Sequence, residues 1–268
     1  ILIIIILHSC NMKKNELVEP MAKKVDKILK MHDHERNDEF YWLNQRGNPE
    51  VIDYLNAEND YRDKYMKGYK SLENELFEEI KARIKEDDTS VPYLENGYYY
   101  YTRYEKGKQY PIYCRKKDNL SNPEEVLIDA NKMSEGHEYF RIGGIDISPN
   151  NKIMAYSVDT VSRILYTVNF KNFESGEESS YTISNTSGGV TWANDNKTIF
   201  YNQKNIHTLR TERVMRHNLD SDKNDEVVFF EADDEFNLYS YKSKSGKYII
   251  VVSGKTCLLY TSPSPRDS

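Results

Sequence analysis

Near residue 90 the apolar residues change their spacing, and this change divides the sequence into two parts. Between residues 48 and 86 they recur at steps of three and four, the period of one helix face. This stripe consists of Tyr61, Tyr65, Tyr69, Leu72, Leu76, Ile80 and Ile84. Asn48-Pro49-Glu50 provides a helix start, with an N-cap, a proline in the first turn and an early acid. We expect two helices, divided at Gly68, with the second ended by the polar run 87–90.

From residue 91 short aromatic and β-branched runs alternate with Asn, Gly and Lys turns, which is typical of strands. Residues 112–114, 163–168 and 213–216 are examples of such runs. A turn followed by a strand also recurs along this part. The copies are Asn150-Asn151-Lys152, Asp195-Asn196-Lys197 and Ser245-Gly246-Lys247, with a weaker one at Glu95-Asn96-Gly97.

The spacing of these copies predicts the architecture. Their lysines are 45 and 50 residues apart, and two or three further strands fit between consecutive copies. A turn-and-strand unit of this length predicts β-propeller blades, whereas a β-sandwich with evenly spaced hairpins is the alternative. Three to four blades fit between residues 91 and 256, so we expect an open part of a ring. The fold class is therefore mainly β with N-terminal helices.

Residues 1–20 have the composition of a truncated signal segment and a tether. Seven apolar residues open the chain, too few to cross a bilayer but suited to the end of a signal-peptide apolar region. Leu7-His8-Ser9-Cys10 then resembles a bacterial lipobox, in which the cysteine receives lipid. We expect lipidated Cys10 to attach the protein to a membrane of the bacterial cell envelope. A buried N-terminal strand and a cytoplasmic location are the alternatives.

At the other end, residues 257–268 form a distinct tail. Cys257 to Asp267 resemble the conceptual translation of a transposase sequencing adapter. We therefore expect the natural sequence to depart from the printed one after Thr256 and to continue for an unknown length. The expected organisation is a signal segment at 1–20, a helical extension at 21–90, a partial propeller at 91–256 and this tail. Cys114 is then the single cysteine inside the folded body, which offers no internal disulfide.

Composition narrows the class of protein further. The 37 Lys and Arg against 43 Asp and Glu give a net charge of −6, which argues against a nucleic-acid partner. Charged residues make up 30% of the chain and its mean hydropathy is −0.79, so a polytopic membrane protein is excluded. The 22 tyrosines and an apolar share of 38% indicate a lean, tyrosine-rich core.

Several motifs that suggest chemistry have plainer interpretations. His32-Asp33-His34-Glu35 lies in a charged segment without the spacing that puts two imidazoles on one helix face, so we expect no metal site. Gly143-Gly144 and Gly188-Gly189 lack a P-loop lysine and a following helix, and we interpret them as turns that lead into strands. The acidic run 231–235 is interpreted as a solvated loop. Since no Gly-x-Ser-x-Gly occurs, we expect neither catalytic residues nor a cofactor in this chain.

Phrases spread over residues 20–253 recur together in one known family. They include His32-Asp33-His34-Glu35-Arg36, Tyr41-Trp42-Leu43, Asn48-Pro49-Glu50, Gly144-Ile145-Asp146-Ile147-Ser148-Pro149, Trp192-Ala193-Asn194-Asp195, Leu209-Arg210, His217-Asn218-Leu219 and Asp234-Glu235-Phe236. In combination they resemble the N-terminal half of oligopeptidase B, in the prolyl oligopeptidase family of serine peptidases. Asp33 departs from the pattern, because many relatives carry glycine there; the departure affects a turn.

The resemblance implies a seven-bladed propeller that caps an α/β-hydrolase domain, with the N-terminal helices packed on the hydrolase side. It implies cleavage of short peptides after Lys or Arg by a Ser-Asp-His triad, while the propeller restricts access. The triad and the carboxylates that select a basic side chain belong to the C-terminal domain, which this sequence lacks. We therefore transfer no catalytic residue and expect the chain alone to be inactive. Its expected partners are short peptides and that missing domain.

Two other functions compete with this one. A non-catalytic propeller could act as a binding or scaffold lipoprotein, and its chain would end when the ring closes. The helical segment weakens this alternative, because a free propeller has no use for two helices whose apolar stripes need another surface. A dipeptidyl or acylaminoacyl relative would keep the fold and change the substrate.

The lipobox resemblance gives a direct prediction. When the complete gene is expressed in a bacterium fed a labelled fatty acid, the protein should take up the label and sediment with membranes. Cys10→Ser should abolish both, whereas Cys114→Ser should change neither. Equal labelling of the wild-type protein and the Cys10→Ser variant would contradict lipidation at this residue.

Overall fold

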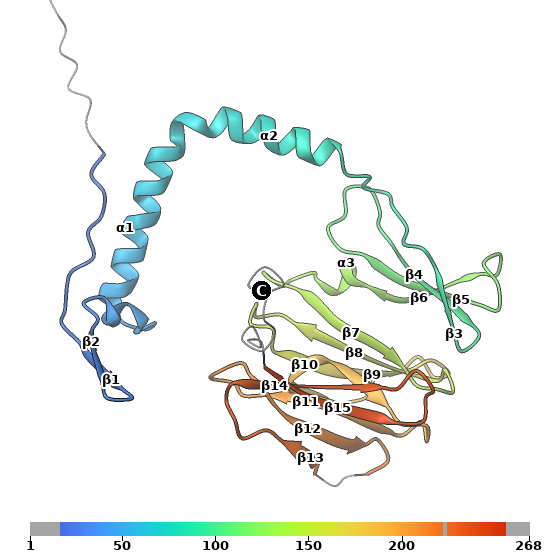
Figure 1. Ribbon diagram of the computed structural model, residues 1–268. Helices are drawn as coiled ribbons and strands as arrows, with labels where there is room; N and C mark the ends of the chain where they lie inside the picture. The colour runs from blue at the N-terminus through green and yellow to red at the C-terminus, as the bar shows by residue number, and fades with distance from the viewer. Residues whose placement is uncertain (1–16, 222–223, 256–268) are drawn as a thin grey trace, which may run out of the picture. The chain divides into compact units, whose positions relative to one another are not determined.

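The computed structural model describes residues 17–221 and 224–255 of the chain (Figure 1). Cys10 and the tail at 257–268 lie outside the described residues. Contacts between Cα atoms divide the chain into two compact units between Lys85 and Glu86, a few residues before the boundary expected from the sequence. Residues 86–90 join the second unit because Ser90 donates its backbone N–H to Thr102 and Thr89 bridges Arg103.

The first unit begins with a β-hairpin where the sequence suggested an irregular segment. Its strands are β1 (Ile28–Met31) and β2 (His34–Asn37), which pair antiparallel. His32 and Asp33 form the turn with φ angles of 48° and 60°, the left-handed pair that a two-residue hairpin needs. The glycine of the related sequences suits that conformation, and aspartate tolerates it.

The helices follow a short 3₁₀ turn, η1 (Tyr41–Asn44). They are α1 (Pro49–Met66), the 3₁₀ turn η2 (Lys67–Tyr69) and α2 (Lys70–Ala82), so the division at Gly68 is confirmed. Asn48 caps α1 by accepting the backbone N–H of Glu50 at 3.0 Å. The second helix ends earlier than expected, at Ala82. None of the helices in the described part of the chain is long and apolar enough to cross a membrane.

The apolar stripe of the helices is exposed along most of its length. Tyr61, Tyr65 and Tyr69 stack along α1 and η2 with ring centroids 6.1 and 6.3 Å apart. Farther along, Leu72, Leu76, Ile80 and Ile84 are between 47% and 63% exposed. By contrast, Trp42 and Val51 form a small buried core at the start of α1, where the Trp42 indole donates to the Lys23 carbonyl at 2.9 Å.

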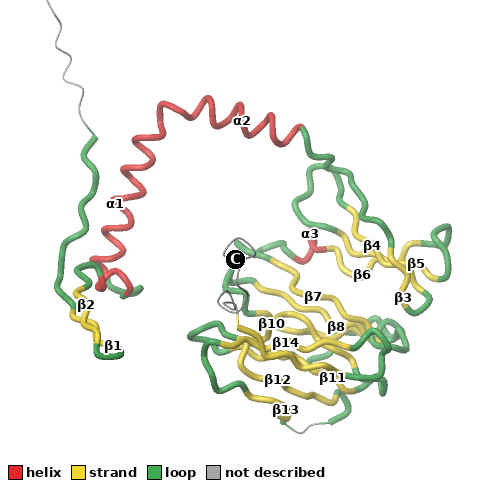
Figure 2. Tube along the Cα trace, viewed as in Figure 1, coloured by secondary structure: helices red, strands yellow, loops and turns green. Residues whose placement is uncertain are grey.

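The second unit consists mainly of strands and loops (Figure 2), and its antiparallel sheets of four, seven and two strands follow one another along the chain. The first blade is β3 (Tyr93–Glu95), β4 (Tyr98–Arg103), β5 (Ile112–Lys117) and β6 (Glu124–Asp129). After α3 (Ala130–Met133) the second blade contains β7 (Arg141–Ile147), β8 (Ile153–Asp159), β9 (Tyr166–Asn172) and the start of β10 (Ile183–Trp192). The third continues with β11 (Thr198–Lys204), β12 (Thr211–Asn218) and β13 (Glu226–Phe230), and the fourth begins with β14 (Phe236–Lys242) and β15 (Ile249–Lys255). The prediction of three to four propeller blades is confirmed.

Strand β10 belongs to two blades. Its residue Ile183 pairs with Val168 of β9, whereas Val190 pairs with Tyr201 of β11. The register shifts on both sides near Thr186, so the strand leaves the outer edge of one blade and becomes the inner strand of the next. The hydrogen bonds therefore join both blades into one seven-stranded sheet.

The turns of the predicted repeat are structurally equivalent. Asn151, Asn196 and Gly246 have φ angles of 61°, 63° and 71°, and Asn96 in the weaker copy has 46°. Asparagine and glycine are the residues that adopt this left-handed conformation most easily. Each turn leads into the second strand of its blade, as the repeat predicts.

Side chains of these turns also link neighbouring blades. The Asn151 amide donates to the Asn96 carbonyl at 3.0 Å, from the second blade to the first. Asn196 of the third blade accepts the backbone N–H of Asn150 at 2.8 Å, and the Asn194 amide donates to the Gly246 carbonyl at 3.0 Å. We call this chain of three contacts the turn ladder.

The core lies between successive blades. One cluster joins the first and second blades through residues that include Tyr100, Leu127, Met154 and Tyr156. The other lies between the second and third blades and includes Val168, Phe170, Ile199, Tyr201 and Met215. Tyrosine thus fills part of the interior, as the composition suggested.

Two local expectations were wrong. Residues 163–165 precede β9 instead of belonging to it, because the buried Asp159 carboxylate accepts four backbone N–H groups from residues 161–164 and folds them into a loop. The glycine pairs at 143–144 and 188–189 lie inside β7 and β10, at shifts of register, instead of in turns that lead into those strands. They permit close packing: a Cβ on Gly143 would meet the Tyr166 ring at 2.5 Å, and one on Gly144 would lie 3.0 Å from the Gly188 carbonyl.

This packing predicts different outcomes at two glycines of the same pattern. Gly143→Ala forces the Tyr166 ring and Ser157 to move, at a cost of about 1–3 kcal/mol for overpacking. Amides in β8 and β9 should then exchange with deuterium about tenfold faster, measured by mass spectrometry. Gly189→Ala is the control, since its Cβ would meet nothing within 4 Å. Similar exchange in both variants would contradict the packing account.

Candidate functional site

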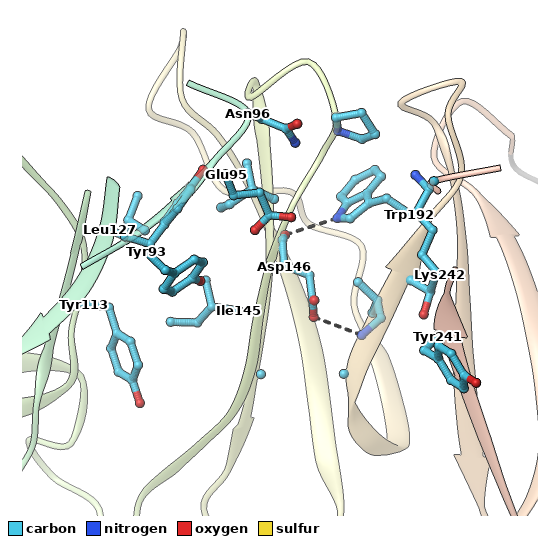
Figure 3. A pocket seen from close by; sticks show the side chains of 18 of the residues that line it. Tyr93, Glu95, Asn96, Tyr113, Leu127, Ile145, Asp146, Trp192, Tyr241 and Lys242 are labelled. Carbon is cyan, nitrogen blue, oxygen red and sulfur yellow. Dashed lines mark hydrogen bonds between the residues drawn. The ribbon is translucent and has the colours of Figure 1, made fainter. Parts of the chain in front are cut away.

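The inner strands and turns of the four blades line a cavity of about 1060 Å³, which lies entirely within the second unit (Figure 3). The inner strands are β3, β7, the end of β10 and β14, one from each blade. Aromatic side chains on this wall include Tyr93, Trp192 and Tyr241, and its carboxylates are Glu95 and Asp146. The lining also includes residues of β4, β5, β6 and β11, such as Tyr101, Cys114 and Asn202, so the cavity is not confined to the inner strands.

Asp146 joins the second blade to the third. Its Oδ2 accepts the Val190 backbone N–H at 3.1 Å, and its main-chain carbonyl accepts the Trp192 indole N–H at the same distance (Figure 3). Burial raises the pKa of the Asp146 carboxyl to about 6, against the lowering effect of the Val190 N–H and with a smaller contribution from the negative charge of Glu95. The residue thus changes charge close to neutral pH.

The third and fourth blades are joined in a similar way. Thr191 donates its hydroxyl to the Ser240 carbonyl at 3.3 Å. Near the first blade the Tyr93 and Tyr100 rings stack with centroids 5.5 Å apart, and burial raises the pKa of both phenols. Three of the four inner strands are therefore fixed relative to one another by hydrogen bonds that line the cavity.

The arrangement is suited to binding. The cavity lining includes serines and Cys114, but no histidine among the described residues that could act as a base beside them. Burial raises the pKa of the Cys114 thiol to about 11, so this cysteine stays protonated and unreactive at neutral pH. Carboxylates, amides and aromatic faces remain, and these groups recognise peptide ends and side chains.

Comparison with known proteins identifies the architecture. A family model described as the prolyl oligopeptidase N-terminal β-propeller domain matches residues 19–267. The chain belongs to this family. Its propeller is thus the N-terminal β-propeller of prolyl oligopeptidase relatives, as the sequence phrases indicated.

Individual members show how much of a relative the chain represents. It is 39% identical over 249 residues to dipeptidyl aminopeptidase BI of Pseudoxanthomonas mexicana, covering 86% of this chain and 34% of that protein. It is 33% identical to protease 2 of Moraxella lacunata, covering 87% and 35%. The structure of oligopeptidase B from Leishmania major matches with a TM-score of 0.81 at 29% identity, covering 89% and 36%. The chain spans about a third of the length of these relatives.

Of the residues that the sequence singled out, Gly143, Gly144, Gly189 and Cys114 line the cavity, whereas the histidine pair belongs to the first unit. His32 and His34 lie at the exposed hairpin turn of the first unit, and no group of three or more His, Cys, Asp or Glu side chains among the described residues could hold a metal ion. The acidic run is a loop between β13 and β14 whose residues 232–235 are exposed, as predicted. Arg210 holds it through bonds to the carbonyls of Glu231 and Asp233, and Glu231 accepts the Ser253 hydroxyl at 2.5 Å.

Sequence reasoning missed the wall itself. Asp146 was noticed only as part of a family phrase, although a carboxylate between Ile145 and Ile147 in an apolar strand is an available signal. Glu95 and Lys242 gave no signal, because strands distant in sequence bring them to one cavity.

The raised pKa of Asp146 predicts that the stability of the contact between the second and third blades depends on pH. Since the folded value lies above the unfolded value of about 3.9, the native state binds the proton first, and stability falls as pH rises from 4 to 6. The loss is roughly 2 kcal/mol after allowance for solvent screening. Asp146→Asn keeps an acceptor for the Val190 N–H and removes the titration. Amides of β10 in the wild type should exchange about tenfold faster, relative to this variant, at pH 7.5 than at pH 4.5.

Glu135→Gln is the control for this measurement, because Glu135 does not line the cavity. Its ratio to the wild type should not change with pH. If the ratio of β10 exchange rates between the wild type and Asp146→Asn stays constant over this pH range, the Asp146 carboxyl does not titrate there.

Proposed function

We propose that the complete protein is a serine oligopeptidase and that this chain is the propeller portion that restricts access to its active site. The observation that carries the proposal is the family match over residues 19–267, together with relatives named as peptidases of which the chain spans about a third. The described residues contribute a binding wall and no catalytic group, so the chain alone is inactive. Catalysis then belongs to a hydrolase domain encoded further along the gene.

Two substrate preferences have support. Likeness to oligopeptidase B of Leishmania major favours cleavage of short peptides after Lys or Arg, the specificity implied by the family phrases. The 39% identity to a dipeptidyl aminopeptidase favours removal of dipeptides from a free amino end instead. Both preferences require short, unfolded peptides, which a narrow channel through a propeller selects by size.

The exposed helical stripe has a function in this proposal. A continuous apolar face on α2, with Leu76 and Ile80 about half exposed or more, is costly in water and is a surface for docking. The proposed occupant is the hydrolase domain of the same protein. Attachment to the cell envelope through Cys10 remains part of the proposal and rests on the lipobox pattern alone.

Reading the gene beyond the codon for Thr256, from the same DNA source and with a different library chemistry, tests the assignment. The frame should continue through further blades into Gly-x-Ser-x-Gly, followed by an Asp and a His. The complete product should release a fluorophore from an arginyl or lysyl amide, whereas the 268-residue chain should not. A frame that stops when the ring closes would favour a non-catalytic binding propeller.

The products distinguish the two preferences. A peptide with an internal arginine and an acetylated amino end should be cut by an oligopeptidase and left intact by a dipeptidyl peptidase. Mass spectrometry of the products shows which bond is broken.

A further inference from the structure

The inner wall carries four charges that are held apart. Glu95 and Asp146 lie on the first and second blades, whereas Lys242 and Lys244 lie on the fourth. Figure 3 shows Glu95 and Asp146 on one side of Trp192 and Lys242 on the other. Within the described part of the chain none of the four forms an ion pair, although many other charged side chains do, such as Arg103 with Glu124. Unpaired charges of opposite sign therefore face one cavity from opposite ends.

Between these ends the wall offers unused hydrogen-bond acceptors. Asn202 of β11 lines the cavity, is only 8% exposed, and its Oδ1 has no partner among the described residues. The Ser240 hydroxyl lines the same cavity and is buried without a partner in the same part of the structure. A buried polar atom without a partner costs free energy. Both atoms lie below the accessible surface, so the wall's suitability for a peptide is argued from its charges.

Separated charges on a concave surface produce a field directed across it. We propose that this surface, the dipolar wall of Glu95, Asp146, Lys242 and Lys244, binds short peptides by both free ends. The ammonium end lies toward Glu95 and Asp146, and the carboxylate end lies toward Lys242 and Lys244. The inference rests on the proposed peptidase function and adds a requirement for unblocked ends.

The spacing of the blades limits the length of such a peptide. Packed sheets lie about 10 Å apart, so three steps, from Glu95 on the first blade to Lys242 on the fourth, span at most about 30 Å. An extended chain covers about 3.3 Å per residue, which gives an upper limit of about nine residues. Longer peptides cannot place both ends on the wall while extended.

Trp192 provides a local reporter for binding. Trp42 and Trp192 are the two tryptophans of the sequence, so Trp42→Phe leaves the cavity residue as the single indole. The probes are alanine peptides of three to nine residues, each with free ends, with an acetylated amino end, with an amidated carboxyl end or with both ends blocked. Fluorescence titration of the full 268-residue chain gives the dissociation constant of each, and chromatography confirms that the peptides stay intact.

At each length, the free-ended peptide should bind more tightly than the doubly blocked one. Blocking either end should weaken binding about fivefold, the size of a partly screened ion pair, and 0.5 M salt should reduce the difference. Equal affinity for the free and the doubly blocked peptide would overturn the proposal without any variant.

Charge-removing variants assign each end. Glu95→Gln should reduce the effect of acetylation, because Asp146 remains, while keeping that of amidation, and Lys242→Gln should do the reverse because Lys244 remains. Glu135→Gln and Lys108→Gln, which remove the same charges outside the cavity, should leave both effects unchanged. Circular dichroism confirms that each variant is folded. If a variant does not fold, the comparison of free and blocked peptides still tests the proposal, because it needs no charge-removing variant.

The outcomes separate this inference from the proposed function. Equal binding of free and blocked peptides, with a hydrolase motif found downstream, removes the dipolar wall and keeps the peptidase. End-dependent binding without such a motif keeps the wall as a peptide-binding surface and removes the peptidase.

Discussion

The turn ladder is the contact on which the geometry of the second unit depends. Each link uses a side chain from one blade to hold the turn of its neighbour, as when Asn196 accepts the backbone N–H of Asn150. Because the turns stand at the same point in each blade, the links fix how far successive blades rotate relative to each other. The inner strands then approach closely enough for Asp146 to reach the Val190 N–H. The cavity wall is a consequence of that approach.

Close approach carries a cost that is concentrated at the wall. Glycine at 144 and 188 lets two backbones come together, and Asp146 places a carboxyl where burial disfavours its charge. An apolar side chain at position 146 would pack between the two blades without the cost of burying a charge. A carboxylate retained here, in a cavity that also holds Glu95 and Lys242, suits a surface that binds charged groups.

Features of the fold that neighbouring residues determine could be predicted from the sequence. Features that depend on pairing between distant strands could not. The repeated turns predicted the blades, because Asn151, Asn196 and Gly246 are residue types that readily adopt the left-handed backbone found at these turns. The sequence did not predict that strand β10 belongs to two blades, because this depends on the pairing of its two halves with β9 and β11. The loop around Asp159 was missed for a related reason: one carboxylate replaces the strand pairing that its β-branched sequence suggested. The charged wall depends on strands more than 140 residues apart, and no local pattern reports it.

Size and charge act on a peptide as independent filters. A channel selects by width, which excludes folded proteins but admits any extended segment, including a loop of a longer chain. A wall that pairs with both ends admits a loop poorly, because a loop has no free end to offer. The two together would restrict a peptidase to short products of earlier proteolysis. This combination suits a dipeptidyl preference as well as an oligopeptidase one, since each begins with a peptide whose ends are free. Under the proposed function, the propeller would contribute to the choice of substrate before any hydrolase residue makes contact.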